Sequence, residues 1–329
     1  MVMRAVVLVG GEGTRLRPLT LTRPKPLLPV AHVSMLERKL AHLAEHGVTE
    51  VVLSLGYKPD AFMKAFSHGV AAGVKLQYAV EPNPLDTAGA IRFAASAAGF
   101  LNGEDVVIAV NGDTLTSIDL SAQLRFHRSR GAAATIALTR VEDPSAFGVV
   151  PIDCNGRVET FVEKPSREDA PTDWINAGMY VLEPSVFTHI PDHERISIER
   201  AVFPILVAEG SLFAVQDPAY WLDAGTPATL LQANLDALAQ GALGVDPGAR
   251  VEGQVVNSVV SAGSTVAANA VVERSVLMRN VVVESIAQVA DSVIGDGARI
   301  CAGAVLRDCC VVGDGVVVPA GTYFGERFS

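Results

Sequence analysis

The stretch VLVGGEGTRLRPLTLTRPKPLLPV, residues 7–30, places glycines and cations directly after the first apolar run of the chain. That run, residues 4–9, is predicted to be a buried parallel strand. Gly10, Gly11 and Gly13 allow backbone N–H groups to approach phosphate oxygens closely, and the arginines and Lys25 supply positive charge. The stretch therefore predicts an anion-binding loop at the end of a strand.

Two common phosphate-binding loops are excluded by the residues of this stretch. A P-loop requires Gly-Lys followed by Ser or Thr, and that sequence is missing. A dinucleotide-binding fingerprint requires a third glycine at the position where Leu16 stands. The anion that the loop binds must be identified from other parts of the chain.

Strands and helices are predicted to alternate over most of the chain. The predicted strands are residues 48–54, 74–80, 105–110 and 132–141. The predicted helices are residues 34–47, 59–68, 87–98 and 119–130, with two more near 199–208 and 226–239. This alternation predicts an α/β sheet with helices on both faces, interrupted by extended segments and turns at residues 147–181.

After Gly244 the composition changes sharply, because His and Lys vanish and Val, Ala and Gly dominate. GDGARI at 295–300 and GDGVVV at 313–318 are near copies. Large apolar residues recur every six positions, with one slip of register, at Val260, Val266, Val272, Met278, Ile294, Ile300, Leu306, Val312 and Val318. This period predicts a left-handed parallel β-helix of hexapeptide repeats. An ordinary β-sandwich is the alternative, but its alternation of two does not produce a six-residue period.

Composition limits the class of protein and its partners. The 329 residues, 49% of them hydrophobic, are enough for a large core and more than one domain. A formal net charge of −10 disfavours nucleic acid and anionic membranes as partners. No apolar run is long enough to span a bilayer or to act as a signal peptide, and the four cysteines lack CxxC spacing. The sequence predicts a soluble, cytoplasmic protein without a zinc site or a disulfide framework.

The string GGEGTRLRPLT followed by RPKPLLPV resembles the signature of the sugar nucleotidyltransferases, or NDP-sugar pyrophosphorylases. Further segments resemble that family in the same order: EPNPLDTAGAI (81–91), VNGDTL (110–115), FGVV (147–150), FVEKP (161–165), INAGMY (175–180) and YWLDAGTP (220–227). LVGG is most similar to the mannose-1-phosphate guanylyltransferases. The resemblance implies a Rossmann-like catalytic domain with a mixed sheet over residues 1–240, followed by the β-helix domain over residues 241–329.

In that family a sugar 1-phosphate attacks the α-phosphate of a nucleoside triphosphate, and pyrophosphate leaves. The resemblance implies that Arg15 and Lys25 bind the triphosphate and that Asp113 and Asp223 hold Mg²⁺, which prefers hard oxygen ligands. Lys164 is expected to bind the phosphate of the sugar 1-phosphate. The nucleotide-binding set is Leu8, Gly10, Gly11, Gly13, Thr14, Glu81, Thr87 and Gly112, and the sugar-phosphate-binding set is Gly148, Glu163, Lys164 and Asn176.

The alternatives are a solvated surface position for Lys25, a turn or cap role for each Asp, and an exposed strand for Glu163 and Lys164. Arg17 and Arg23 fit surface charges as well as ligands.

Glu81 bears on the choice of base. A carboxylate only accepts hydrogen bonds, and guanine presents two adjacent donors, so Glu81 favours GTP. The alternative is that Glu81 caps the following loop. Asp86 departs from the LGTAG sequence that is frequent in the family, although Asp tolerates a left-handed backbone.

The sequence thus predicts guanylyl transfer from GTP to mannose 1-phosphate. The alternatives are a glucose-1-phosphate uridylyl- or thymidylyltransferase and a non-catalytic regulatory paralogue that binds an NDP-sugar. The paralogue should have lost the cations or carboxylates, which are all present here. An acyltransferase site in the β-helix is disfavoured because no His follows His193. The tail is therefore expected to be structural and to support a homo-oligomer, a dimer or higher.

Overall fold

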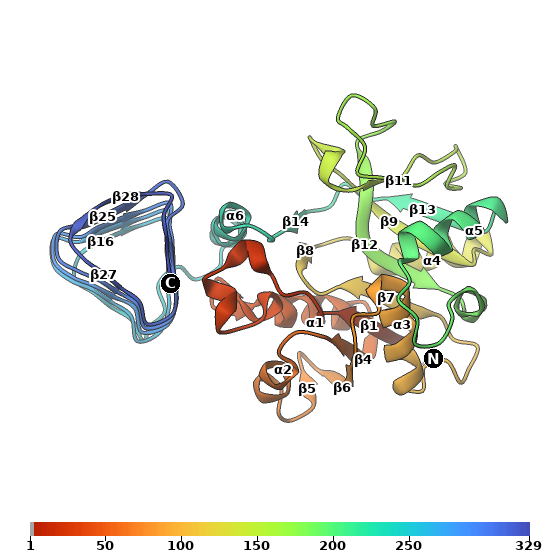
Figure 1. Ribbon diagram of the computed structural model, residues 1–329, viewed down its shortest axis with the longest axis horizontal. Coiled ribbons are helices and arrows are strands. Elements are labelled where there is room, and N and C mark those ends of the chain that lie inside the picture. Colours follow the sequence, from red (N-terminus) through yellow and green to blue (C-terminus); the bar gives the residue numbers. More distant parts are fainter. Residues whose placement is uncertain (1–2) are drawn as a thin grey trace. The chain divides into compact units, whose positions relative to one another are not determined.

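The computed structural model describes residues 3–329, which form two compact units (Figure 1). The first unit contains the residues up to Gly10 and Leu36–Trp221, and the second contains Gly11–Met35 and Leu222–Ser329. The stretch after the first strand therefore forms one compact unit with the C-terminal part of the chain. Among the residues described, no helix is both long and apolar enough to cross a membrane.

The first unit is built on one mixed sheet. Its main path runs β11-β10-β12-β7-β1-β4-β6-β5, with β9 paired to β12 and β13. β1 lies parallel to β4 and β7, whereas β12 is antiparallel to β7 and β9. The strands of this unit are β1 (Met3–Leu8), β4 (Val48–Leu55), β5 (Val70–Ala71), β6 (Val74–Val80), β7 (Val107–Asn111), β8 (Thr114–Thr116), β9 (Ala134–Arg140), β10 (Gly148–Val149), β11 (Val162–Glu163), β12 (Trp174–Leu182) and β13 (Leu212–Gln216). The mixed sheet that the family resemblance implied is confirmed.

Six α-helices are present among residues 3–329: α1 (Met35–Glu45), α2 (Pro59–Ala65), α3 (Asp86–Ala97), α4 (Leu120–Arg130), α5 (Phe203–Ala208) and α6 (Pro227–Ala239). Helix α4 begins where Oδ1 of Asp119 accepts the N–H of Ala122, and it is followed by Gly131 in the left-handed region. Helix α2 is shorter than predicted. Phe66 leaves the helical conformation, and its carbonyl accepts the hydroxyl of Tyr78 on β6.

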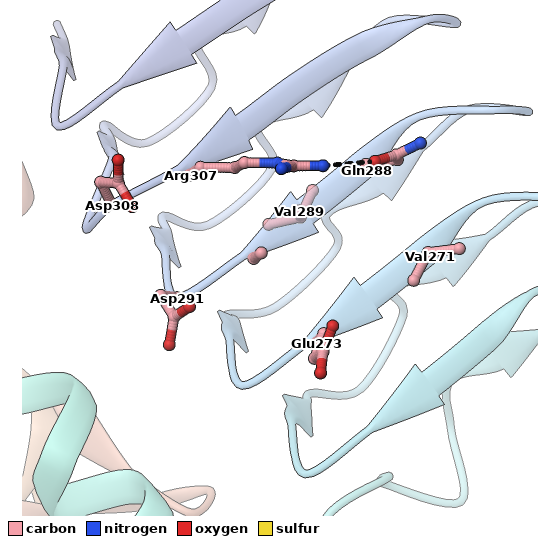
Figure 2. Close-up of a pocket in the computed structure, with 8 residues that line it drawn as sticks. Val271, Glu273, Gln288, Val289, Asp291, Arg307 and Asp308 are labelled. Carbon is pink, nitrogen blue, oxygen red and sulfur yellow. Dashed lines mark hydrogen bonds between the residues drawn. The ribbon is translucent and has the colours of Figure 1, made fainter.

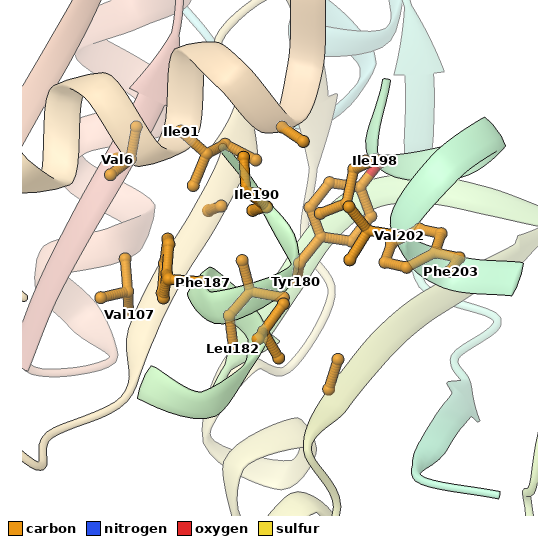
Figure 3. Packing of buried hydrophobic residues seen from close by; sticks show 14 of the residues in the cluster. Val6, Ile91, Val107, Tyr180, Leu182, Phe187, Ile190, Ile198, Val202 and Phe203 are labelled. Carbon is orange, nitrogen blue, oxygen red and sulfur yellow. The ribbon is translucent and has the colours of Figure 1, made fainter. Parts of the chain in front are cut away.

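The core of this unit fills the space between the sheet and its helices. Figure 3 shows Ile91 of α3 near Val6 of β1, and Val107 of β7 in the same cluster with Leu182 of β12. These side chains are at most 1% exposed. Burial of such apolar surface is the main stabilising contribution to the sheet, and it fixes the strand ends that carry the candidate site.

The C-terminal part of the chain is a β-helix, whose coils form a triangle in Figure 1. Each side of the triangle is a parallel five-stranded sheet. The first sheet is β15 (Arg250–Val251), β18 (Thr265–Val266), β21 (Val282–Val283), β24 (Arg299–Ile300) and β27 (Val317–Val318). The second is β16 (Gln254–Val256), β19 (Val271–Glu273), β22 (Gln288–Ala290), β25 (Ala304–Arg307) and β28 (Gly321–Phe324). The third is β17 (Val259–Val260), β20 (Val276–Leu277), β23 (Val293–Ile294), β26 (Val311–Val312) and β29 (Arg327–Phe328).

The coil length explains the slip in the six-residue period. Val260 is aligned with Leu277, Leu277 with Ile294, and Ile294 with Val312, which are steps of 17, 17 and 18 residues. Three hexapeptides would occupy 18 residues, so a 17-residue coil shifts the sequence period by one. The residues named in the repeat are at most 1% exposed, which confirms the predicted β-helix. The position of Met278 in the repeat was wrong, because the register slips one residue earlier and Leu277 occupies the aligned interior position. The second unit also contains β2 (Pro29–Val30), β3 (Val33–Ser34) and most of β14 (Trp221–Asp223).

Candidate active site

The glycine-rich stretch of the second unit folds into short 3₁₀ turns that hold Lys25. Gly13 has φ +64°, and a Cβ there would lie 3.0 Å from Cβ of Lys25 and 3.1 Å from Cγ2 of Thr20. The hydroxyl of Thr20 donates to the carbonyl of Gly13 at 2.8 Å. Gly13 is therefore required both for its left-handed backbone and for the close approach of Lys25.

Lys25 is buried beside a carboxylate. Its side chain is 6% exposed, and Nζ lies 2.7 Å from Oδ1 of Asp223. Nη2 of Arg15, whose side chain is largely exposed, lies 3.6 Å from Oδ2 of the same Asp223. The structure thus brings together three of the predicted catalytic residues, and the alternative of a solvated surface lysine is wrong.

Gly225 makes room for this cluster. A Cβ at Gly225 would lie 2.7 Å from Nη2 of Arg15 and 2.9 Å and 3.1 Å from the two oxygens of Asp223. The carboxylate therefore lies against bare backbone, where a hard cation can approach it. Gly225 was not predicted as a site residue, although it lies two residues after Asp223 in the DAGTP sequence.

Asp113 lies in the first unit, in the turn between β7 and β8. The turn lies close to β1, because the N–H of Gly112 donates to the carbonyl of Leu8 and a Cβ on Gly112 would be 2.4 Å from Cγ1 of Val9. Asp113 thus follows the C-terminal end of a strand that is parallel to β1, where open α/β sheets bind ligands.

A buried lysine lies near Asp113. Lys39 of α1 is 3% exposed, and its Nζ donates to Oγ1 of Thr114 at 3.2 Å. Burial lowers the pKa of Lys39 to about 8, while the carboxylate of Asp113 acts in the opposite direction. Lys39 was not predicted from the sequence, because a lysine in an amphipathic helix ordinarily faces water.

Glu81 follows β6, and each of its carboxylate oxygens accepts a hydrogen bond from another residue of the chain. Oε1 accepts the hydroxyl of Ser54 at 2.9 Å, and Oε2 accepts the N–H of Leu85 at 3.0 Å. This geometry favours the loop-capping alternative, although each oxygen retains a second lone pair. Asp86 has φ +61°, in agreement with the predicted tolerance for a left-handed backbone, and its Oδ1 accepts the N–H of Thr87 at 2.8 Å.

Glu199 joins Thr87, predicted on the nucleotide side, to Asn176, predicted on the sugar side. Oε2 of Glu199 accepts the hydroxyl of Thr87 at 2.8 Å, and Oε1 lies 3.5 Å from the hydroxyl of Tyr180. Nδ2 of Asn176 donates to that hydroxyl at 2.8 Å. Burial raises the pKa of Tyr180 well above its ordinary value, and Glu199 adds to the shift. Glu199 was not predicted from the sequence, because it lies in none of the family segments.

Three of the four predicted sugar-phosphate residues lie on β10, β11 and the following turn, and Asn176 lies on β12. A Cβ on Gly148 would lie 2.4 Å from Cζ of Phe161 and 3.1 Å from Oε2 of Glu163, so packing against Phe161 requires glycine. Lys164 has φ +50°, and its side chain is 61% exposed with Nζ 3.4 Å from Oε1 of Glu163. Glu163 and Lys164 are accordingly exposed, as the alternative predicted, and their role stays a prediction.

Four further predicted nucleotide residues line the end of β1 and the start of the loop. Leu8 is aligned with Ser54 of β4 and Asn111 of β7. A Cβ on Gly10 would lie 3.6 Å from Oε1 of Glu81, whereas a Cβ on Gly11 would meet open space. Thr14 begins the first 3₁₀ turn and is exposed.

The β-helix carries a groove on its second sheet (Figure 2). Arg307 donates from Nη2 to Oε1 of Gln288 at 3.1 Å, and the acidic side chains of Glu273, Asp291 and Asp308 lie around the groove. None of its lining residues is a histidine or a cysteine. The groove therefore offers no histidine of the kind on which the acyltransferase alternative was judged.

Comparison with known families identifies the chain. The nucleotidyl transferase family matches residues 4–240, and the GlmU-like, C-terminal hexapeptide family matches residues 242–328. The chain belongs to the nucleotidyl transferase family. Nucleotidyl transferases of this family generally use a divalent metal ion.

Relatives of this nucleotidyl transferase extend over nearly its whole length. The mannose-1-phosphate guanylyltransferase of Mycobacterium tuberculosis is 41% identical over 319 residues, covering 96% of this chain and 81% of that protein. Mannose-1-phosphate guanylyltransferase 1 of Arabidopsis thaliana is 35% identical, covering 96% of this chain and 92% of that protein. A solved structure from Bacillus anthracis, named as a glucose-1-phosphate thymidylyltransferase, has a TM-score of 0.64 at 26% identity and covers 73% of this chain and 96% of that chain.

The residues present fit a divalent metal ion. Within residues 3–329 no group of three or more His, Cys, Asp or Glu side chains could hold a metal. Mg²⁺, however, commonly uses one or two carboxylates and completes its shell with water and substrate phosphates. Asp223 over the bare backbone of Gly225 and Asp113 at a strand end supply carboxylates of that type.

Proposed function

We propose that this nucleotidyl transferase makes GDP-mannose from GTP and mannose 1-phosphate. An oxygen of the sugar phosphate attacks the α-phosphorus of GTP. The bond from that phosphorus to the bridging oxygen of the β-phosphate breaks, and pyrophosphate leaves. The observation that carries the proposal is the cluster of Lys25, Asp223 and Arg15, in which Lys25 is buried and all three residues belong to the family segments. The names of the relatives that match 96% of the chain support the choice of substrates.

The reaction joins two polyanions, so the site must supply positive charge before chemistry begins. We propose that Lys25 and Arg15 bind the triphosphate and that Lys164 binds the sugar phosphate. Mg²⁺ held by Asp113 and Asp223 would shield the negative charge of the α-phosphate and so weaken its repulsion of the incoming oxygen. No general base is required, because the attacking phosphate is already anionic at neutral pH.

The remaining predicted residues are proposed to contact the sugar and the nucleotide. Glu163 and Asn176 are proposed to meet sugar hydroxyls. The loop glycines, with Leu8, Thr14, Thr87 and Gly112, are proposed to surround the nucleotide. Asn176 is held by Tyr180 and Glu199, which would fix the orientation of its amide.

For the base, we propose that Glu81 accepts from guanine with the lone pairs that Ser54 and Leu85 leave. The Glu81→Gln variant tests this role, because glutamine keeps the size of the side chain but offers only one acceptor oxygen. We expect its preference to move away from GTP in a competition of four nucleoside triphosphates. An unchanged preference would leave Glu81 with its loop-capping role alone.

The deciding experiment measures pyrophosphate release with four nucleoside triphosphates against the 1-phosphates of mannose, glucose and N-acetylglucosamine. We expect the highest kcat/KM with GTP and mannose 1-phosphate. Higher kcat/KM with glucose 1-phosphate and UTP or dTTP would favour a uridylyl- or thymidylyltransferase. Binding without turnover for every pair would favour a regulatory paralogue.

Three broader expectations belong to the same proposal. Residues 1–240 would form the catalytic domain and residues 241–329 the β-helix domain. A homo-oligomer formed through the β-helix is proposed, and light scattering on the purified chain would measure it. The location of the protein in the cytoplasm also stays a prediction.

A further inference from the structure

The two near copies in the β-helix place two aspartates one above the other. Asp296 and Asp314 occupy the same position in GDGARI and GDGVVV, and the following strands β24 and β27 are aligned. Oδ1 of Asp314 accepts the N–H of Asp296 at 2.8 Å, and Oδ1 of Asp296 accepts the N–H of Arg279 at 2.9 Å. One oxygen of each carboxylate is thus used to stack the coils, which leaves Oδ2 for another partner.

That partner is the loop after β1, whose residues Thr22 and Arg23 belong to the same compact unit as the β-helix. Nη2 of Arg23 forms ion pairs with Oδ2 of Asp296 and, at 3.1 Å, with Oδ2 of Asp314. The hydroxyl of Thr22 donates to Oδ2 of Asp314 at 2.6 Å. Burial lowers the pKa of Arg23, but the two carboxylates outweigh it and the pKa lies above its ordinary value. The side chain of Arg23 is 23% exposed, and its guanidinium is therefore held by the aspartates of the β-helix.

Two further contacts hold the same part of the loop. Nη1 of Arg327 donates to the carbonyl of Arg17 at 3.0 Å. A Cβ on Gly313 would lie 3.2 Å from Cβ of Pro18, so the first glycine of the second copy makes room for this proline. Residues 17–23 are thus fixed on the stacked turns by an ion-pair cluster, a backbone contact and close packing.

The anchor is two residues away from the proposed phosphate-binding lysine. Pro24 separates Arg23 from Lys25, and Pro26 follows. A proline ring fixes φ near −65°, so this segment transmits the position of Arg23 to Lys25 with little freedom. Lys25 then begins a 3₁₀ turn and places Nζ 2.7 Å from Oδ1 of Asp223.

We propose that Arg23 is a positioning residue for nucleotidyl transfer and that Asp296 and Asp314 of the β-helix hold it in place. The β-helix then supports residues 17–23, which position Lys25, and is not only a structural tail. Arg23 acts through Lys25 and touches no substrate. The catalytic consequence rests on the function proposed above, whereas the anchoring of the loop does not.

The test uses the full chain with Asp296→Asn and Asp314→Asn together. Asparagine keeps the acceptor oxygen for the coil N–H groups but removes both charges that face Arg23. We expect kcat for pyrophosphate release to fall about ten- to a hundredfold, as for the loss of a charge-assisted contact. KM should change much less, because misplaced reacting groups lower kcat chiefly. Hydrogen–deuterium exchange of residues 14–28 should rise in the absence of substrate.

A matched control and a second variant separate positioning from other roles. Asp291→Asn makes the same substitution on the same β-helix, in an exposed pair with Arg274 at 2.8 Å, and should leave kcat and loop exchange unchanged. Arg23→Ala should match the double Asn variant, and adding it to that variant should lower kcat no further. Arg23→Lys should recover part of the loss.

Two results would overturn the proposal. If Arg23→Ala lowered kcat while the double Asn variant behaved as wild type, Arg23 would contact substrate directly. If loop exchange stayed at the wild-type level in the double Asn variant, the aspartates would not hold the loop. A wild-type enzyme without turnover for any substrate pair would refute the proposed function, and exchange would still decide whether the anchor exists.

Discussion

Replacing Lys25 with methionine separates the stability of the buried cluster from its catalytic role. The substitution keeps an apolar stem in a site that is 6% exposed and removes the ammonium 2.7 Å from Asp223. Breaking a fully buried ion pair costs about 3–5 kcal/mol. Asp223 retains 25% exposure and has Arg15 at 3.6 Å, so we expect a smaller loss of about 1–3 kcal/mol.

The effect on kcat/KM should be of similar size to the loss of stability but should have a separate cause. Lys25 is proposed to meet the triphosphate, and a charge-assisted contact contributes about 1.5–3 kcal/mol, or about ten- to a hundredfold in kcat/KM. Adding Asp223→Asn removes the carboxylate that has lost its closest cation. The double variant should therefore be more stable than Lys25→Met alone and yet no more active.

Thermal denaturation at neutral pH and pyrophosphate release on the same preparations provide the measurement. Lys64→Met, at an exposed position of α2, is the matched control and should change neither quantity. Turnover at the wild-type level in a destabilised Lys25→Met variant would refute the catalytic role of Lys25. A double variant less stable than Lys25→Met would refute the reasoning about the uncompensated carboxylate.

Three other variants test separate parts of the structure. Asp113→Ala should retain the circular dichroism spectrum and lose turnover at every Mg²⁺ concentration; activity near wild type would remove Asp113 from the site. In Gly225→Ala the new Cβ would lie 2.7 Å from Nη2 of Arg15 and 2.9 Å from Oδ1 of Asp223, and displacing these groups should lower kcat about a hundredfold. Unchanged kinetics would show that the cluster adapts. Burial, aided by nearby positive charge, lowers the pKa of His42 to about 4, below its ordinary value of 6.5, so the unfolded chain binds the proton first as pH falls. Stability should thus be lost between about pH 6.5 and pH 4, and more steeply than in His42→Gln; parallel thermal-denaturation curves for the two proteins would contradict this.

Local rules accounted for most of the fold. The six-residue period located most of the inward-facing residues of the β-helix, because each side of the coil must bury one apolar residue, but it placed Met278 where Leu277 lies. The left-handed backbone at Asp86 agrees with the tolerance of aspartate for that region. The end of α2 was misplaced, because the tertiary contact from Tyr78 to Phe66 decides it.

The candidate site was less predictable, because its contacts join distant parts of the chain. Lys39 and Glu199 lie in no family segment, and only the folded structure places them beside Thr114 and Thr87. The repeated GDG turns were visible in the sequence as near copies. Nothing in their spacing indicated that both aspartates face one arginine more than 270 positions earlier.

The carboxylate partners of the loop cations distinguish catalytic from anchoring residues. Lys25 and Arg15 both face Asp223, a carboxylate that rests on bare backbone and is proposed to hold a metal ion. The two cations would then be released toward phosphate without leaving an uncompensated charge behind. Arg23 cannot exchange partners in this way, because Asp296 and Asp314 are also fixed by backbone N–H groups of the coils. The crowding of cations after the first strand therefore combines two electrostatic tasks: one set attracts the triphosphate, and Arg23 holds that set in place.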